Sequence, residues 1–387
     1  MEVLPTIEAE SVHTCVTSPP YFGLRIYDIP PTAWPAVEYS PMAGLPPVEI
    51  PEWEGHLGLE DDPYAYIGHL VEVFRRVRRV LRDDGTLWCN LGDRYASGGC
   101  GGGGKHRVAW DDQPELSRWR PPPSGLKHKD LIGIPWRLAL ALQADGWYWR
   151  SPCALWHKPT CRPENVADRP TLDYEPVLMF AKSRHYYFDM DAVREPHKTV
   201  SLMPPQTWSG TARDYPDVDG HPGGRAMRTI WSIATGKGQG GHSSVFPEEL
   251  PVRPIKAGTS EHGCCSVCGA PYRRIVEITY EESPEHGPGS QVGRRGGDGR
   301  RDTGLPRKRK VANTLGWDPT CDCDADDPVP CTVLDPFSGT GTTGLVAHRL
   351  GRSYVGIDAD ANNNQTAAER IRQDAPLLTQ DIREEAI

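Results

Sequence analysis

Short stretches that contain several apolar residues and are bounded by turn residues recur along the chain, and each predicts a strand. Residues 12–17, 86–90 and 332–335 are runs of this kind. Between the first two, residues 64–82 carry apolar side chains at intervals of three and four, with arginines on the opposite face. That spacing is typical of an amphipathic helix. Short strands that alternate with helices indicate an α/β fold with a mostly parallel sheet.

The pattern is clearest near the end of the chain. The strand at 332–335 leads into a glycine loop, a helix over 343–350, a second strand over 353–358 and a second helix over 360–372. A strand, a glycine loop, a helix and a second strand ending in Asp form half of a nucleotide-binding, doubly wound sheet. The end of the chain therefore predicts a nucleotide-like ligand.

Other segments complete the expected organisation. A helix is predicted over 130–144, with Asp130 as its N-cap. Further strands are expected over 147–156 and 174–181, and ordered structure returns over 230–233 and 246–250. The Pro-rich residues 28–56 and the Gly- and Pro-rich residues 97–127 predict loops. Residues 190–228 lack a sustained period and are the best candidate for a small recognition region.

The glycine loop has the sequence Asp335-Pro336-Phe337-Ser338-Gly339-Thr340-Gly341-Thr342-Thr343. Its glycines allow a tight turn and a close approach to a ligand, and its final threonines lie where free helix N–H groups can bind a carboxylate. Asp358 ends the next strand, where an acid can accept hydrogen bonds from ribose hydroxyls. A glycine pair alone would indicate only a tight turn, but the full run with Asp358 favours a cofactor site. No Gly-Lys-Ser/Thr sequence is present, which argues against a P-loop ATPase.

The loop Thr17-Ser18-Pro19-Pro20-Tyr21 directly follows the first predicted strand. Its two prolines restrict the backbone and remove two N–H donors, so carbonyl oxygens can remain available to hold an amine. Ser18 adds a second polar group, and Tyr21 offers a ring on which a base can stack. Alone, the segment would be read as a Pro-Pro turn.

Together, the two loops resemble those of the DNA amino-methyltransferases, which modify N4 of cytosine or N6 of adenine. The catalytic loop precedes the cofactor loop by over 300 residues, an order similar to that of the circularly permuted beta subclass. Further stretches resemble family segments: 85–88 with 90–93, 156–159, 168–171 with Tyr174 and Glu175, and 242–248. The resemblance implies a permuted, seven-stranded S-adenosylmethionine-dependent methyltransferase fold, to which the cysteine spacing described below adds a zinc-knuckle insertion.

The resemblance also implies a mechanism without a covalent enzyme intermediate. A flipped base would stack on Tyr21, and its amino group would be held by Ser18 and the Pro19 carbonyl while the nitrogen attacks the sulfonium methyl. The expected catalytic residues are Ser18, Pro19, Pro20 and Tyr21. The expected S-adenosylmethionine-binding residues are Thr17, Asp335, Pro336, Phe337, Ser338, Gly339, Gly341, Thr342, Thr343 and Asp358.

A serine before the two prolines favours N4 of cytosine as the target, with N6 of adenine as the alternative. A DNA-binding regulatory module with a decayed fold is a competing interpretation, although both loops are intact. Methylation of protein or RNA is a third. The expected domains are the catalytic half (1–189), the recognition region (190–228), a return to the core (229–260), a Cys-rich basic insertion (261–330) and the cofactor half (331–387).

Cysteine spacing predicts a metal site in the insertion. Cys265 and Cys268 form a CxxCG knuckle, and Cys321 and Cys323 form a CxC pair, so four thiolates could hold a structural zinc ion. Cys264 and His262 are alternative ligands, and cysteines in loops that bind no metal are the less favoured interpretation. Eleven cysteines in a chain without a signal segment do not predict a disulfide framework.

Charge and composition bear on the partners. The chain has 387 residues, enough for two or three domains, and its net charge of −9 argues weakly against nucleic acid. Residues 294–310, however, contain eight basic and two acidic side chains, a local patch that could contact DNA phosphates. No segment resembles a signal or a membrane span. We therefore expect a cytoplasmic protein of a bacterium or phage-infected host, monomeric or dimeric, with double-stranded DNA and a cognate restriction enzyme as partners.

Overall fold

A seven-stranded sheet forms the centre of the computed structural model, which describes residues 2–23, 29–96, 125–161, 164, 166–196, 221–235, 246–282, 308–325 and 327–374. In spatial order the strands are β13 (Ser353–Gly356), β12 (Thr332–Asp335), β1 (Val12–Thr17), β6 (Leu81–Asn90), β8 (Tyr174–Ala181), β7 (Tyr148–His157) and β9 (Ile230–Ser232). Neighbouring strands are parallel except at β6–β8 and β8–β7, which are antiparallel. The prediction of a mostly parallel α/β sheet is confirmed.

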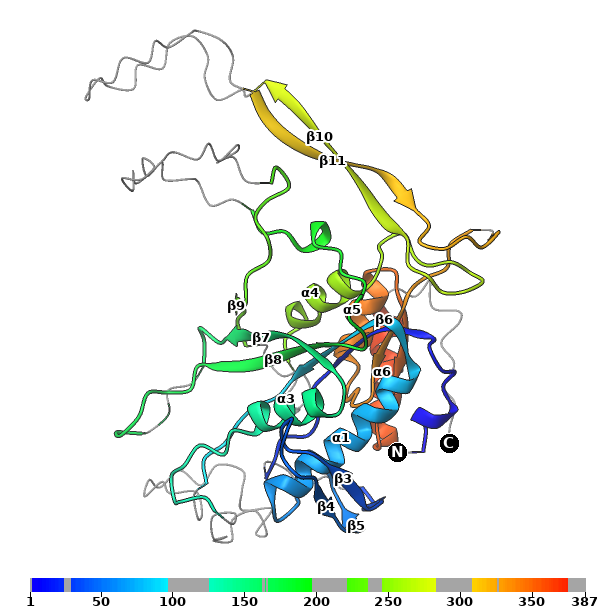
Figure 1. The fold of residues 1–387 in the computed structure, drawn as a ribbon. Helices are drawn as coiled ribbons and strands as arrows, with labels where there is room; N and C mark the ends of the chain where they lie inside the picture. Colours follow the sequence, from blue (N-terminus) through cyan, green and yellow to red (C-terminus); the bar gives the residue numbers. More distant parts are fainter. Residues whose placement is uncertain are drawn as a thin grey trace, which may run out of the picture.

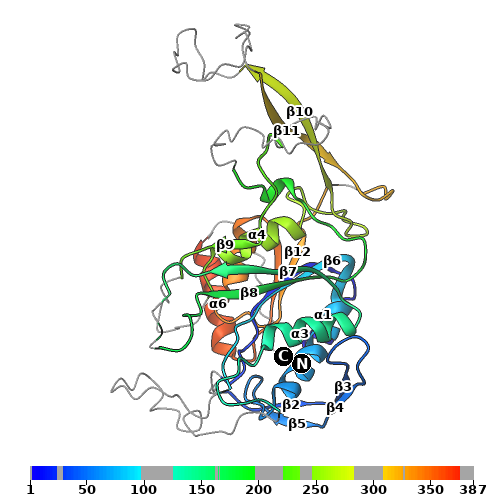
Figure 2. The ribbon, with the colours of Figure 1, turned by 60° about the vertical axis from the view of Figure 1, so that its left-hand side comes forward.

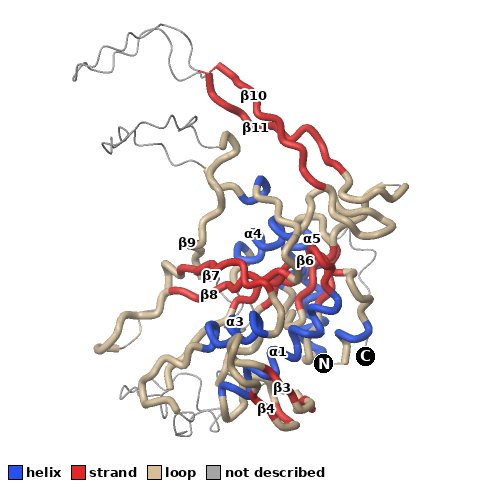
Figure 3. The backbone as a smooth tube through the Cα atoms, viewed as in Figure 1, coloured by secondary structure: helices blue, strands red, loops and turns tan. Residues whose placement is uncertain are grey.

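Helices cover both faces of this sheet (Figure 3). On one face lie α1 (Pro63–Val80) and α3 (Ile134–Ala144), and on the other lie α4 (Glu249–Gly258) and α5 (Thr342–Arg349), with α6 (Ala361–Asp374) packed against α5. Consecutive residues of β6 contribute to the two cores, since Leu87 belongs to the first cluster and Trp88 to the second. Side chains alternate across a strand, so both faces of the central strands are buried.

The strand β1 lies in the middle of the parallel part, between β12 and β6. All six of its residues are buried. Its polar side chains, those of His13, Thr14 and Thr17, are buried as well, because both faces of this parallel strand are covered. The loop that follows is thereby anchored to the most buried part of the molecule.

The start of α3 corrects one prediction. The helix begins at Ile134, after Gly133 in the left-handed conformation (φ 79°), rather than at Asp130. The side chain of Asp130 instead accepts a hydrogen bond from the Lys127 backbone N–H at 2.8 Å. The first amides of the helix donate to Asp93, from Gly133 at 3.0 Å and from Ile134 at 3.1 Å. A residue 40 positions away caps this helix, which local sequence cannot reveal.

The Pro-rich residues 28–56 are also ordered more fully than expected. They contain two small antiparallel sheets, β2 (Thr32–Trp34) with β5 (Trp53–Gly55) and β3 (Val37–Tyr39) with β4 (Val48–Ile50). The prediction of a surface loop here is wrong, because Tyr39 and Ile50 are buried against α1. A Cβ at Gly68 of α1 would lie 2.9 Å from the Ile50 side chain, so the helix approaches this small subdomain closely.

Three other predicted segments are described in part. Ordered structure at 230–233 and 246–250 corresponds to β9 and to the start of α4. The candidate recognition region contains the short helix η2 (Asp191–Val193), while 197–220 lie outside the described residues, as do 97–124. A short helix η1 (Leu4–Thr6) precedes β1. Within the described part of the chain, no helix is both long and apolar enough to cross a membrane.

The insertion at 261–330 contains a long two-stranded ribbon that projects away from the body (Figures 1 and 2). Its strands are β10 (Arg273–Glu282) and β11 (Lys308–Asp318), which pair in antiparallel fashion from Arg273 opposite Asp318 to Glu282 opposite Lys308. Of the basic segment 294–310, residues 308–310 form the start of β11. Residues 294–307 lie outside the described residues.

Candidate active site and a four-cysteine cluster

The two sequence-predicted loops leave the sheet side by side. Strands β1 and β12 are parallel neighbours, with Thr14 opposite Val333 and Cys15 opposite Leu334. The loop after β1 and the loop after β12 therefore emerge at the same edge of the sheet. Their first residues are bonded directly, because Thr17 Oγ1 donates to Asp335 Oδ1 at 2.6 Å across 318 positions of sequence.

The Asp335 carboxylate connects the two loops through its hydrogen bonds. Its Oδ1 also accepts from the Phe337 backbone N–H at 3.1 Å, and its Oδ2 accepts from Thr343 Oγ1 at 2.8 Å. The residue is 1% exposed, and this burial raises the pKa of its carboxyl group to about 6. Thr17, Asp335 and Thr343 are predicted cofactor contacts, yet their side chains satisfy one another, which favours a role in holding the loops together.

The glycine loop adopts the backbone that its sequence suggests. Gly339 (φ 51°) and Gly341 (φ 77°) are both left-handed, a conformation that favours glycine. A Cβ at Gly341 would lie 2.5 Å from the Ala367 Cβ, so α6 also requires a glycine here. Thr342 then begins α5, whose N-terminal amides open next to the loop.

Asp358 follows β13 and faces the glycine loop. Its Oδ2 accepts from the Gly339 backbone N–H at 2.8 Å, while its Oδ1 accepts from the Asp360 N–H at 2.9 Å and from Asn363 Nδ2 at 3.0 Å. These bonds fix the orientation of the carboxylate beside the glycine loop.

The Ser-Pro-Pro-Tyr loop is held by groups from several elements. The Pro20 carbonyl accepts from Tyr66 Oη of α1 at 2.6 Å. Tyr21 Oη donates to Glu175 Oε2 at 2.6 Å and lies 3.1 Å from Asn90 Oδ1. A Cβ at Gly92 would lie 2.4 Å from the Tyr21 ring, so a glycine is needed beside it.

The buried side chains of Glu60 and His69 support the segment that packs against this loop. The Gly58 backbone N–H donates to Glu60 Oε2 at 2.7 Å, and Glu60 Oε1 lies 2.8 Å from His69 Nδ1. Gly58 (φ 94°) is packed so closely that a Cβ would lie 2.8 Å from the Tyr21 carbonyl oxygen. The His69 ring stacks with two indoles, that of Trp34 at 4.8 Å and that of Trp53 at 5.3 Å between ring centres.

Three residues without an assigned role in the sequence complete the polar lining. Lys158 Nζ lies 2.8 Å from Glu175 Oε1, and Asn90 donates to the Pro176 carbonyl at 3.2 Å. Burial, followed by the charge of Glu175, raises the pKa of Tyr21 well above its usual range, so the phenol stays protonated and donates. Asn90, Lys158 and Glu175 all lie in stretches that resemble family segments, and this resemblance was the only sequence signal that could have pointed to them.

One cavity of about 710 Å³ joins these features. Residues of the first loop that line it are Ser18, Pro19, Pro20 and Tyr21. The segment after β12 contributes Pro336, Phe337, Ser338, Gly339, Thr340, Thr342 and Asp358. Asn90, Lys158 and Glu175 line it as well. A cofactor on the glycine loop and a base on the Pro-Pro loop would therefore share a single space.

The four predicted metal ligands form a separate cluster. The sulfur atoms of Cys265, Cys268, Cys321 and Cys323 all lie within 4.8 Å of one another. Sulfurs around a tetrahedral zinc ion at about 2.3 Å would be about 3.8 Å apart, so small adjustments would close the site. The two alternative ligands are engaged elsewhere: the His262 ring stacks on Trp317 at 5.7 Å, and Cys264 groups with His13 and Cys331.

Comparisons with known proteins agree with this arrangement. The sequence profile of the family described as DNA methylase matches residues 12–265 and 331–369. The type II methyltransferase M.SmaI of Serratia marcescens is 33% identical over 376 residues, which cover 96% of this chain and 87% of that protein. M.Cfr9I of Citrobacter freundii is 32% identical over 374 residues, covering 96% of this chain and 85% of that protein.

Among solved structures, the PvuII DNA methyltransferase (cytosine-N4-specific) aligns with 99% of this chain and 85% of that chain, at 14% identity and a TM-score of 0.48. That likeness is too low to add to the assignment. The profile match and the full-length relatives are sufficient. The chain therefore belongs to the DNA methylase family, the enzymes that transfer a methyl group from S-adenosylmethionine to N4 of cytosine or N6 of adenine in DNA.

Proposed function

We propose that this protein methylates N4 of cytosine at a specific DNA sequence, and that it is the modification enzyme of a type II restriction–modification pair. The observation that supports methyl transfer most directly is the single cavity lined by both loops. The choice of cytosine rests on Ser18, because the other residue commonly found at this position in such loops is acidic. A cognate endonuclease is inferred from the names of the type II relatives.

The cofactor half of the cavity has the features that S-adenosylmethionine requires. Asp358 presents an oriented carboxylate to a ribose, and the amides at the start of α5 can bind a carboxylate group. Pro336 and Phe337 add apolar surface to the same wall. When bound, S-adenosylmethionine supplies the electrophilic methyl group.

The catalytic loop would hold the target amine. The Pro20 carbonyl already accepts a hydrogen bond from Tyr66. We therefore propose that the exocyclic N–H groups donate to the Pro19 carbonyl and the Ser18 hydroxyl. The base would stack on Tyr21, whose hydroxyl is tethered to Glu175 and Asn90. Such tethering would position the amine nitrogen to attack the methyl group, and positioning of this kind can supply a large part of the rate enhancement. In this proposal, no cysteine acts as a nucleophile.

Product analysis tests both the reaction and the base. The protein is incubated with DNA of mixed sequence and labelled S-adenosylmethionine, and the digested nucleosides are separated by mass spectrometry. N4-methylcytosine is the expected product. N6-methyladenine would overturn the choice of base, and the absence of any methylated nucleoside would overturn DNA methylation itself.

Three substitutions separate catalysis from cofactor binding. Ser18→Ala or Tyr21→Ala should abolish methyl transfer while S-adenosylmethionine still binds, as measured by calorimetry. Asp358→Ala should instead raise the dissociation constant of S-adenosylmethionine. Full activity of the Ser18 and Tyr21 variants would refute the assignment of the catalytic loop.

A further inference from the structure

The ribbon β10–β11 poses a problem of stability. Its strands pair with each other and with no other strand of the described structure, and large apolar side chains on it are solvent-exposed, 47% for Ile278 and 61% for Leu315. An isolated two-stranded ribbon is at best marginally stable in water. Some additional interaction must therefore hold its strands in register, and the obvious place is the root, where Arg273 pairs with Asp318.

The four-cysteine cluster lies at that root. Cys265 and Cys268 come shortly before β10, and Cys321 and Cys323 come shortly after β11, so the sulfurs gather where the two strands begin and end. We propose that these four thiolates bind one Zn²⁺ ion, which clamps the two ends of the ribbon together. Four thiolates with sulfurs this close suit a closed structural site, which leaves no open position for a substrate.

The turn between the first two cysteines has the geometry of a metal knuckle. The Val267 backbone N–H points at Cys265 Sγ at 3.4 Å, and the Gly269 N–H donates to the Cys265 carbonyl at 2.8 Å. Gly269 closes the turn in the left-handed conformation (φ 69°). An N–H group directed at a sulfur stabilises the thiolate that zinc binding requires.

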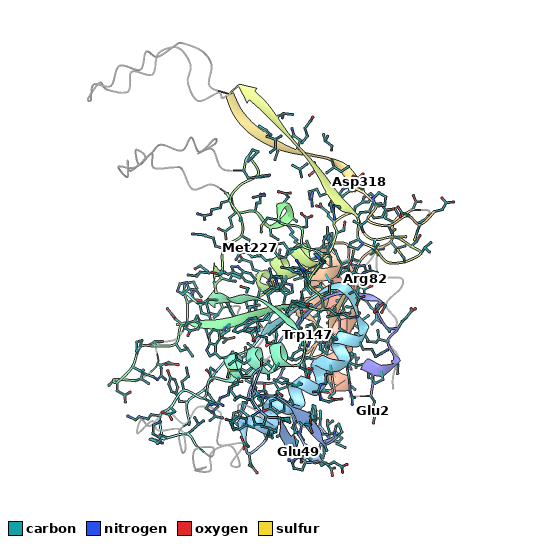
Figure 4. The ribbon with its side chains drawn as sticks, in the orientation of Figure 1. Glu2, Glu49, Arg82, Trp147, Met227 and Asp318 are labelled. Carbon is teal, nitrogen blue, oxygen red and sulfur yellow. The ribbon has the colours of Figure 1, made fainter. Side chains whose placement is uncertain are left out.

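The knuckle is joined to the body through the starts of three strands. His13 of β1 donates from Nε2 to the Gly269 carbonyl at 2.9 Å and accepts at Nδ1 from the Thr332 N–H of β12 at 3.0 Å. Arg82 of β6 donates to the Cys268 carbonyl at 2.7 Å. Figure 4 shows Arg82 near the root of the ribbon, where Asp318 ends β11.

This placement separates the metal from the chemistry. The knuckle lies beside the first residues of β1, β6 and β12. The catalytic and cofactor loops instead follow the last residues of β1 and β12, at the opposite edge of the sheet. Because both nitrogens of His13 are already bonded, the neighbouring group of His13, Cys264 and Cys331 offers no comparable site. The zinc ion is thus inferred to be structural, and its loss should leave the cofactor site intact.

The root has further contacts that set the direction of the ribbon. Arg274 of β10 forms ion pairs with Asp189 at 3.0 Å and with Glu261 at 2.7 Å, and its guanidinium lies 4.3 Å from the centre of the Trp317 ring of β11. These contacts fix one strand to the body and to its partner. The metal would supply the remaining constraint, the closure of the ribbon ends.

Metal analysis and hydrogen exchange test the proposal on the full-length protein. Protein purified without chelator should contain about one zinc ion per chain. A double variant, Cys321→Ser with Cys323→Ser, should lose it, while Cys161→Ser, a cysteine outside the cluster, should retain it. Protein without stoichiometric zinc, or equal zinc in the double variant, would overturn the proposal.

The clamp itself is tested on the wild-type protein, so that misfolding of a variant cannot obscure the result. After zinc is released by a thiol-specific mercurial and a chelator, the amides of β10 and β11 should lose hydrogen-exchange protection, and zinc added after thiol regeneration should restore it. Amides of β1 and β6, and the affinity for S-adenosylmethionine, should not change. Unchanged protection of the ribbon after release would refute the clamp even if zinc is present.

Discussion

Asp335 should make the stability of this protein depend on pH in a predictable direction. Burial raises the pKa of its carboxyl group from 3.8 to about 6, against the opposing effect of hydrogen bonds from Thr17 and Thr343. A shift of about two units corresponds to about 3 kcal/mol at 1.36 kcal/mol per unit. Since the folded state holds this proton more tightly than the unfolded state, the contribution is fully present below pH 3.8 and is lost as pH rises through about 6.

The substitution Asp335→Asn isolates this contribution, because asparagine does not titrate. Urea unfolding of both proteins is measured between about pH 4 and about pH 7, where the Asp335 contribution changes most. The free energy of unfolding of the variant relative to wild type should rise by about 2.4 kcal/mol over that interval, because part of the full contribution is already lost at pH 4. Any fixed cost of the asparagine cancels in this double difference. A difference independent of pH would show that burial of the carboxyl group does not govern its protonation, and the reasoning would fail.

Three further predictions concern the support of the catalytic loop and DNA affinity. Gly92→Ala places a methyl group 2.4 Å from the Tyr21 ring, so methyl transfer should fall by about 100-fold in a labelled-methyl assay with little change in Tm; near-normal turnover would contradict the packing argument. Glu60→Gln removes one of the acceptors that serve Gly58 and His69, so kcat should fall about tenfold while the KM for cofactor holds, and an effect on KM alone would argue against positioning. Neutralising the basic residues of 294–310 should weaken DNA binding and flatten its salt dependence by about 0.9 for each phosphate that the protein no longer neutralises, whereas an unchanged slope in titrations would exclude binding of phosphates by this segment.

The sheet was predictable where burial leaves a mark on the local sequence. Val12, Cys15 and Val16 mark a strand whose two faces are both covered, and Pro63–Val80 shows the helical period because only one of its faces is buried. The strands within 28–56 have three residues each and depend on packing against α1, so no local pattern announces them. Tertiary contacts decide such strands.

The site was predictable as two loops but not as a network. Both motifs lie at the same sheet edge, as expected for loops that follow neighbouring parallel strands. The bonds that connect Tyr21 with Glu175 and Lys158, however, join residues far apart in the chain. The same limitation applies to Asp335, whose type suggests a ligand contact although its carboxylate is satisfied by Thr17 and Thr343. Sequence motifs identify residues, whereas partners depend on the fold.

The separation of β1 from β12 in the chain also bears on how the protein is made. Thr17 and Asp335 are 318 positions apart, so at about 5 to 20 residues per second their contact must wait roughly 15 to 60 s during synthesis. Strand β1 can pair with β6 early, but its other edge has no partner until β12 arrives. An unpaired edge on an apolar strand is a template for aggregation. The order of the two loops thus creates a period in translation during which the nascent catalytic half is most in need of a chaperone.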